Sequence, residues 1–161
     1  MLIERLDEQT VALRDLDLLC CELLHQIAVS AEPGDSTAAR ARLFSSPSGG
    51  REPELDADWK EYVEPGLAHL FRSALGVVQE DLRDFPPAEP ADDYTLHIPV
   101  KHLESWIHAL NQARLAITAR YDFTEREMEG KVPLAGDTRA FALFHVYFYG
   151  ILQEWFLAEL E

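Results

Sequence analysis

The apolar residues of the chain recur at two spacings, every second residue as in a strand and every third or fourth residue as in a helix. A strand pattern followed directly by a helix pattern occurs twice. Alternating apolar positions in residues 2–13 predict two short strands on either side of an acidic turn. A second alternating run, residues 95–100, contains Pro99 and predicts a strand at the edge of a sheet or ending there. Each run passes directly into a helical pattern, so we predict that the strands of both units pair in one small sheet.

Apolar residues at helical spacing predict about four main helices. These helices cover residues 15–29, residues 56–82, residues 100–121 and a last helix that starts at Asp137. Pro65 interrupts the second helix and is expected to begin a fresh one, and residues 36–44 and 124–127 predict shorter helical segments. The fold class is therefore mainly α, with orthogonal, bundle-like packing of about four main helices and a small two- or three-stranded β-sheet.

The last helix is apolar on almost every side between Phe141 and Phe156. Such a helix is either the centre of a bundle or shared with a second subunit. Leu115, on the preceding helix, also points away from the main apolar stripe. Both arrangements stay open, and the second of them is a homodimer.

Arg114 is the most informative single residue of the helix at residues 100–121. Leu103, Ile107 and other apolar residues form one stripe on this helix, and Arg114 projects between those two. A guanidinium group does not lose its proton in practice, so a buried one needs hydrogen-bond acceptors. We predict a carboxylate or carbonyl partner from another helix, with Glu154 as the first candidate and Asp81 as the second.

The candidate site is a polar cluster around this arginine, drawn from two helices. Its members are Asn111, Arg114, Arg120, Gln153 and Glu154. Three interpretations stay open: a buried pair that fixes the register of two helices, an anion-binding site, and a catalytic site. No catalytic residue is assigned, because the order of residues yields no nucleophile and base arrangement.

The aromatic and metal-ligating side chains favour packing over chemistry. Trp106 and Trp155 stand at core spacing, and we expect packing anchors instead of a cofactor pocket. Glu104 and His108 have the one-turn spacing of metal ligands, but they lie on the outward face without a second pair. We therefore predict no metal and no cofactor.

Charge narrows the class of partner. The 161 residues include 29 acidic and 14 basic side chains, for a formal net charge of −15. This charge argues against nucleic acid, where binding begins with Lys and Arg neutralising phosphates, and against anionic membrane surfaces. The adjacent Cys20 and Cys21 form no zinc or redox motif, and the first residues show no signal-peptide pattern. We predict a cytoplasmic protein.

The length and apolar content of the chain fit one domain, so we predict a single helical domain over residues 1–161. Residues 45–55 are rich in Ser, Gly and Pro, and we expect them to be mobile. Residues 85–93 are predicted to be a Pro-rich linker.

One helix and its exit carry a family resemblance. Trp106 to Arg120, followed by Phe123-Thr-Glu, resembles the signature helix and exit of the DUF2017 family, a bacterial domain of unknown function. Leu152-Gln-Glu154 is similar to the closing motif of that family, and residues 42–82 match its layout of an acidic, Pro-rich loop followed by a helix. The resemblance covers nearly the whole chain and is most specific around residues 103–125 and 147–156.

The resemblance implies a small, mostly helical cytoplasmic protein. It also implies a genetic neighbour, since members are often encoded beside the Clp-protease adaptor, and some carry the label of transcriptional regulator. Trp106 and the five residues of the polar cluster match positions that recur in the family.

Two functional hypotheses follow. The first is a non-catalytic interaction or regulatory module linked to Clp-type proteolysis, in which Arg114 is satisfied inside the protein. The second is a small-molecule, anion-binding protein or an enzyme that uses Arg114, Asn111 and Glu154 beside a cavity. A third, a DNA-binding regulator, fits the net charge poorly. We favour the first hypothesis, without catalysis.

Overall fold

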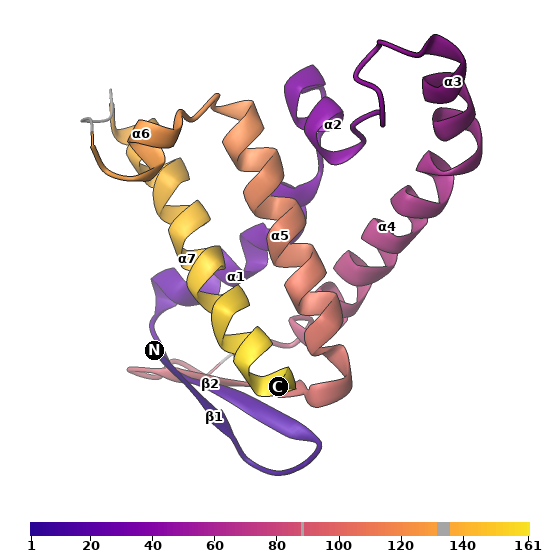
Figure 1. The fold of residues 1–161 in the computed structure, drawn as a ribbon. Coiled ribbons are helices and arrows are strands. Elements are labelled where there is room, and N and C mark those ends of the chain that lie inside the picture. Colours follow the sequence, from indigo (N-terminus) through magenta and orange to yellow (C-terminus); the bar gives the residue numbers. More distant parts are fainter. Residues whose placement is uncertain (88, 132–135) are drawn as a thin grey trace.

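The computed structural model describes residues 1–87, 89–131 and 136–161, so Ala88 of the predicted 85–93 linker lies outside the described residues. Within these ranges the chain is mainly helical and carries one three-stranded sheet (Figure 1). The elements are β1 (Leu2–Arg5), β2 (Thr10–Leu16), α1 (Leu18–Ala31), α2 (Thr37–Leu43), α3 (Pro53–Tyr62), α4 (Glu64–Asp81), β3 (Tyr94–Pro99), η1 (Val100–His102), α5 (Leu103–Arg120), α6 (Glu125–Met128) and α7 (Asp137–Leu160).

The small sheet confirms the pairing expected of the two strand-into-helix units. β2 lies in the middle and pairs antiparallel with β1 on one side and β3 on the other. Val11 pairs with Ile98 and Leu13 pairs with Leu96, and all four side chains are buried. Side chains of a strand alternate between the two faces of a sheet. The alternation at Val11 and Leu13, and at Leu96 and Ile98, therefore marks the face on which the helices pack. In β1 the expectation was wrong, because Leu2 and Leu6 are exposed and Ile3 is the residue that packs against the core.

The described residues contain seven α-helices, more than the four main helices expected. The four long ones are α1, α4, α5 and α7. The two short helices α2 and α6 correspond to the segments predicted at residues 36–44 and 124–127, and α3 is the part of the predicted 56–82 helix that precedes Pro65. Each extra helix has a local start signal: the Ser36 side chain accepts from Ala39 N–H, Pro53 occupies the first turn of α3, and Thr124 forms a capping box with Glu127. Local capping thus adds short helices that hydrophobic spacing alone does not separate.

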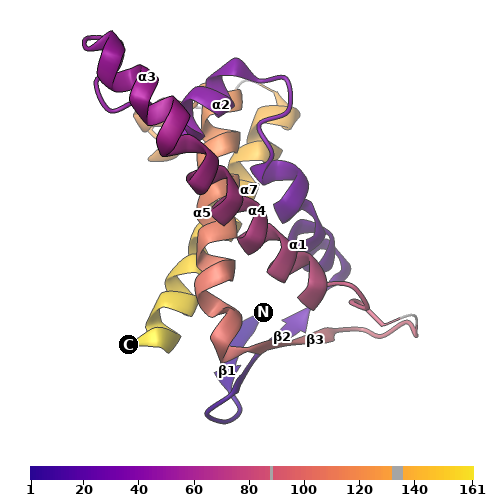
Figure 2. The ribbon, with the colours of Figure 1, turned by 90° about the vertical axis from the view of Figure 1, so that its right-hand side faces the viewer.

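The centre of the molecule is α5, which packs against α1, α2, α4 and α7. Leu103, Trp106 and Leu110 are fully buried, and so are the small residues Ala109 and Ala113 on the same helix, which leave room for neighbouring helices. We expected the last helix at the centre or in a second subunit. It does not lie at the centre: α7 stands at the side of the bundle along α5, while α3 and α4 project from the other side (Figures 1 and 2). Contact with a second subunit remains a prediction.

The segment at residues 45–55 folds back onto Asp56 in the first turn of α3. The Asp56 carboxylate accepts hydrogen bonds from the Ser48 backbone N–H and hydroxyl at 3.0 and 2.7 Å, and from Gly50 N–H at 2.8 Å. These bonds lower the pKa of Asp56, the Ser48 hydroxyl being the largest cause. The predicted mobility of this segment remains a prediction.

The described part of the predicted linker is attached to the core at both ends. Phe85 and Tyr94 are buried and pack edge to face, with ring centroids 6.3 Å apart. The Phe85 carbonyl also accepts a hydrogen bond from the His25 ring on α1. Among the helices described, none is both long enough and apolar enough to cross a membrane.

Candidate functional site

Arg114 lies on the side of α5 that faces α7, and it is half-buried. Its Nη1 donates a hydrogen bond of 2.6 Å to the amide oxygen of Gln153 on α7. Gly150, one turn earlier on α7, leaves room for the guanidinium: a Cβ atom at this position would lie 3.4 Å from Arg114 Cζ. Nε of Arg114 is buried without a hydrogen-bond partner among the described residues. The arginine is thus held by a neutral amide and a glycine, with no carboxylate against it.

The prediction that Glu154 is the partner of Arg114 was wrong. Glu154 is exposed, and the hydrogen bond goes to Gln153, the residue before it. Successive residues of a helix are about 100° apart, so only one of the two can face α5. Because α7 is apolar on nearly every side, its sequence did not identify the face that meets α5.

The two other members of the predicted cluster lie apart from Arg114. Asn111 is exposed, and the neighbouring Gln112 is buried in its place, with its Oε1 unpaired. Arg120 donates a 2.7 Å hydrogen bond to the carbonyl of Glu32, the residue that ends α1. The five predicted residues therefore do not form one cluster: Arg114 and Gln153 are in contact, Arg120 anchors α1, and Asn111 and Glu154 face outward.

Asp81, the second candidate, forms a different network at the end of α4. Its carboxylate side chain is only 8% exposed and accepts hydrogen bonds from Trp106 Nε1 at 2.9 Å and from His102 Nδ1 at 2.9 Å. Trp106 is fully buried and packs edge to face on Phe156, while Trp155 is half-buried at the margin of the core. Because an ionised carboxylate can only accept, His102 must donate through Nδ1. The network fixes the ends of α4 and α5 and of the short helix between β3 and α5.

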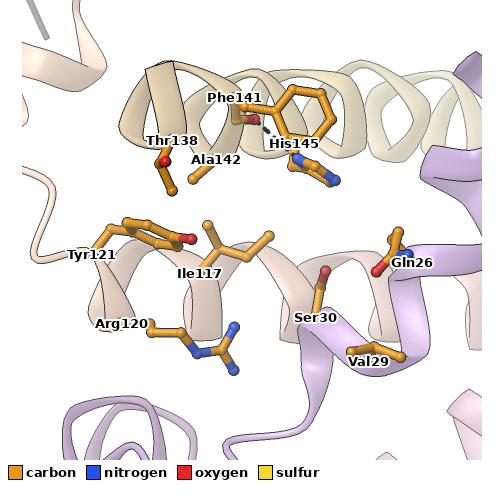
Figure 3. A pocket seen from close by; sticks show the side chains of 10 residues that line it. All are labelled: Gln26, Val29, Ser30, Ile117, Arg120, Tyr121, Thr138, Phe141, Ala142 and His145. Carbon is orange, nitrogen blue, oxygen red and sulfur yellow. Dashed lines mark hydrogen bonds between the residues drawn. The ribbon is translucent and has the colours of Figure 1, made fainter. Parts of the chain in front are cut away.

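A cavity of about 230 Å³ opens between α1, α5 and α7 (Figure 3). Arg120 and Ile117 come from α5, Ser30 from α1, and Ala142 and His145 from α7. The side chains of Ser30 and His145 point toward each other across this space, and Arg120 lies along its lower side in the view shown. The cavity therefore combines one cation, several neutral polar groups and an apolar wall.

A second feature is the face of α7 that points away from α5. Six residues follow one another there at intervals of four and three, and we call them the outer seam: Ala140, Phe144, Tyr147, Ile151, Glu154 and Ala158. All six are exposed, and the three large apolar ones are each 43–44% exposed. Alternating intervals of four and three form the heptad spacing by which one helix packs along another. The outer seam is thus an exposed surface built like a helix–helix interface.

Comparison with known proteins identifies the family. The family model of a domain of unknown function, DUF2017, matches residues 2–160. The chain belongs to the DUF2017 family. No curated protein and no solved structure matches the chain. The resemblance inferred from the helix at residues 103–120 and from the end of the chain is therefore confirmed, and the match includes every helix and strand of the described fold.

The positions of the DUF2017 resemblance divide among three places in the structure. Trp106 belongs to the Asp81 network, Arg114 and Gln153 join α5 to α7, and Arg120 borders the cavity. Sequence reasoning missed the cavity because its residues come from three helices that are far apart along the chain. It missed the outer seam because the spacing is present in the sequence but does not show which side of α7 is exposed.

Two other titratable groups of this DUF2017 protein, Glu127 and Tyr149, form hydrogen bonds within the fold. Glu127 has its pKa lowered to about 2, first by the Thr124 backbone N–H and then by Arg139, whose Nη2 lies 2.6 Å away. Burial raises the pKa of Tyr149, whose hydroxyl donates to the Leu23 carbonyl at 2.8 Å. In the described ranges, no three or more His, Cys, Asp or Glu side chains are grouped so that they could hold a metal ion.

Proposed function

We propose that this protein is a non-catalytic interaction module of the cytoplasm that acts through the outer seam of α7. One observation carries the proposal: a row of large apolar side chains at heptad spacing is exposed on a helix whose opposite face already packs on α5. Contiguous exposed apolar patches on a protein surface commonly mark sites of interaction with another protein. The hydrogen bond from Arg114 to Gln153 supports the same function, because this arginine has an acceptor inside the protein.

The occupant we propose for the seam is a second copy of the chain. α7 has 24 residues, and a helix of that length extends over about 36 Å. The six seam positions are symmetric about residue 149, so an antiparallel copy matches each position with another. Ala140 then meets Ala158 of the second copy, Phe144 meets Glu154, and Tyr147 meets Ile151. Pairs of this kind, one from each type of core position, are those expected for antiparallel helices in a coiled coil.

Charge favours the same arrangement. The whole chain has a formal net charge of −15, yet Glu154 is the only ionised member of the seam. In a parallel pair the two Glu154 side chains would face each other, and like charges at facing positions are unfavourable. In the antiparallel pair each Glu154 lies five residues from the symmetry point, so the two are about 15 Å apart along the helices. The two acidic molecules can therefore meet along a row that carries one charged side chain per copy.

The experiment is sedimentation velocity of the full chain over a range of concentrations. A single pair of helices buries less than the roughly 800 Å² per partner of a standard interface, so we expect a weak dimer, with Kd on the order of 10 μM. Ile151→Glu places a charge in the middle of the seam and should leave only monomer. Leu70→Glu is the matched control, since Leu70 is 65% exposed on α4, away from the seam, and this variant should dimerise like the unmodified chain.

The link to Clp-type proteolysis is tested in parallel by binding of the Clp-protease adaptor to the same three proteins. A chain that stays monomeric but binds the adaptor, and loses that binding in Ile151→Glu, would overturn the second copy as occupant and retain the interaction module. A chain that stays monomeric and binds no adaptor, or binds it equally in Ile151→Glu, would overturn the function proposed for this seam.

A further inference from the structure

We propose that the groove between α2, α3 and α4 binds an extended peptide segment of another protein, a neutral main chain that carries an apolar side chain. The groove consists of two adjoining hollows of about 400 and 360 Å³, which share Arg40, Phe44 and Glu64 in their lining. α2, α3 and the start of α4 lie at the end of the molecule opposite the sheet (Figures 1 and 2). The inference does not depend on the outer seam, because none of the lining residues described belongs to α7.

Gln112 supplies a buried hydrogen-bond acceptor in one of the two hollows. Its side chain comes from α5, is only 5% exposed and lines the hollow of about 360 Å³. Its Nε2 donates to the carbonyl of Ala31 at 3.4 Å, and since a carbonyl only accepts, the nitrogen is the atom that must face Ala31. The amide oxygen Oε1 is left over, buried and without a partner among the described residues. Buried polar atoms are normally hydrogen-bonded, so this oxygen indicates a donor from outside the protein, such as a peptide N–H.

Trp59 supplies a buried donor in the other hollow. It belongs to α3, is half-buried and lines the hollow of about 400 Å³. Its indole Nε1 is buried without a hydrogen-bond partner among the described residues, and an indole N–H can only donate. This nitrogen therefore indicates an acceptor from outside the protein, such as a peptide carbonyl. Of the three buried, unpaired side-chain atoms in the described ranges, two thus line the same groove, and one is a donor while the other is an acceptor.

A main chain in extended form is the occupant that satisfies both atoms. Each residue of a main chain other than proline offers one N–H donor and one C=O acceptor. In an extended segment these groups are free to bond to another molecule, which is how peptides are recognised through their main chain. A single ammonium or carboxylate group would satisfy only one of the two atoms.

The charges of the groove favour a neutral occupant. Three basic and three acidic side chains line it: Arg40, Lys60, Arg72, Glu32, Asp56 and Glu64. The lining is thus balanced in formal charge, whereas the whole chain has 29 acidic and 14 basic side chains. A balanced lining complements neither an anion nor a cation as a whole, and an uncharged main chain fits it best.

An apolar surface common to the two hollows indicates the side chain that the peptide carries. Phe44 lines both hollows, and the centroid of its ring lies 5.7 Å from that of Phe71. Both rings are half-buried, so part of each remains uncovered, and the buried Leu75 belongs to the same lining. A side chain the size of leucine covers this apolar surface and removes it from water.

The first test is ¹H–¹⁵N NMR of the full chain titrated with the neutral peptide acetyl-Ala-Leu-Ala-methylamide. The chain has three tryptophans, and Trp106 and Trp155 serve as internal controls because neither lines the groove. We expect the indole N–H signal of Trp59, identified by its loss in Trp59→Phe, to move downfield saturably while the other two indole signals stay in place. The absence of saturable shifts, or saturable binding that leaves the Trp59 indole signal unmoved, would overturn the proposal.

The second test asks whether Gln112 accepts a peptide N–H. Each amide of the probe peptide is replaced in turn by an ester, which removes one N–H and keeps the length of the chain. One of these esters should bind to the unmodified protein about three- to tenfold more weakly than the peptide, the range expected for one hydrogen bond. Gln112→Met, which lacks the amide oxygen, should bind the peptide as weakly as that ester and no longer distinguish the two. Esters that all bind like the peptide, or a difference that persists in Gln112→Met, would contradict the assignment.

Trp155→Phe is the matched control for Trp59→Phe, since Trp155 is also half-buried but lies on α7. Trp59→Phe should weaken peptide binding about three- to tenfold, and Trp155→Phe should leave it unchanged. Acetate and methylammonium serve as probes with a single charged group, and both should bind more weakly than the peptide. Equal effects of the two tryptophan variants, or tighter binding of either ion than of the peptide, would overturn the peptide as occupant of this groove.

Discussion

Arg114 on α5 and Gln153 on α7 are joined by a hydrogen bond of 2.6 Å, and no carboxylate forms an ion pair with this arginine among the described residues. The cation is stabilised by the oxygen of a neutral amide and by its position over Gly150. Such a contact fixes the register of two helices without a second buried charge. It occupies the side of α7 that faces α5, and the outer seam lies on the opposite side of the same helix.

Removal of the acceptor should destabilise the protein. In Gln153→Leu the Nη1 group of Arg114 loses its partner in a half-buried place, and we expect the free energy of unfolding in urea to fall by about 1–3 kcal/mol. Glu154→Gln is the matched control because its side chain is exposed, and its effect should stay within about 0.5 kcal/mol. A larger effect from Glu154→Gln than from Gln153→Leu would show that the acidic residue is the true partner.

Position 150 should accept alanine and reject a large side chain. A Cβ at this position lies 3.4 Å from the nearest Arg114 atom, which is ordinary contact, and alanine is the better helix former by about 1 kcal/mol. We expect Gly150→Ala to be neutral or to stabilise the fold by up to about 1 kcal/mol. Gly150→Leu should place its side chain where the guanidinium lies and lower the thermal midpoint. If both substitutions raised the midpoint, Arg114 could not be packed over this glycine.

The Asp81 network should contribute measurably to stability. Asp81→Leu leaves the buried Trp106 N–H and the His102 ring without their acceptor, and hydrogen bonds to a charged group are worth about 1.5–3 kcal/mol. We expect a loss of this size in urea unfolding followed by tryptophan fluorescence. Asp84→Asn, an exposed residue close by, should have little effect. Equal stability of the two variants would show that the hydrogen bonds of Asp81 do not stabilise the fold.

Glu127 should make the start of α7 sensitive to acid. The pKa of its carboxyl is lowered from 4.5 to about 2 in the folded state, so its contribution to stability is complete above the unfolded pKa. This contribution is lost as the pH falls from about 4.5 toward 2. Carboxyl NMR titration should give the low value, and Thr124→Ala should raise it because the hydroxyl donor is removed. A midpoint near 4.5 in the unmodified chain would show that the capping box is open in solution.

The sequence predicted the positions of strands and helices better than it predicted which side chains contact each other. Alternation at Val11 and Leu13, and again at Leu96 and Ile98, was sufficient to predict the small sheet, because these four side chains are paired across the strands and buried. The helical spacing that placed Arg114 on a buried stripe was also informative. It could not decide between Gln153 and Glu154 as the partner, because a helix that is apolar on nearly every side gives no sign of which face meets α5.

The cavity could not have been predicted from one sequence. Ser30, Arg120 and His145 stand on three helices, and only the crossing of those helices brings them to one place. Arg120 was included in the predicted cluster because it borders the apolar stripe that contains Arg114, whereas in space it bonds to the end of α1. The spacing of the outer seam was visible, yet its exposure depends on α7 lying at the side of the bundle and not at its centre.

The most direct test of the antiparallel seam is disulfide trapping between two different variants. Ala140→Cys and Ala158→Cys are made separately in chains that have Cys20 and Cys21 replaced by serine, and they are oxidised alone and as a mixture. The antiparallel arrangement predicts a covalent dimer in the mixture and little covalent dimer in either variant alone. The reason is that residue 140 of one copy lies opposite residue 158 of the other, whereas two residues 140, or two residues 158, lie far apart. Covalent dimers from each variant alone, or none from the mixture, would contradict it.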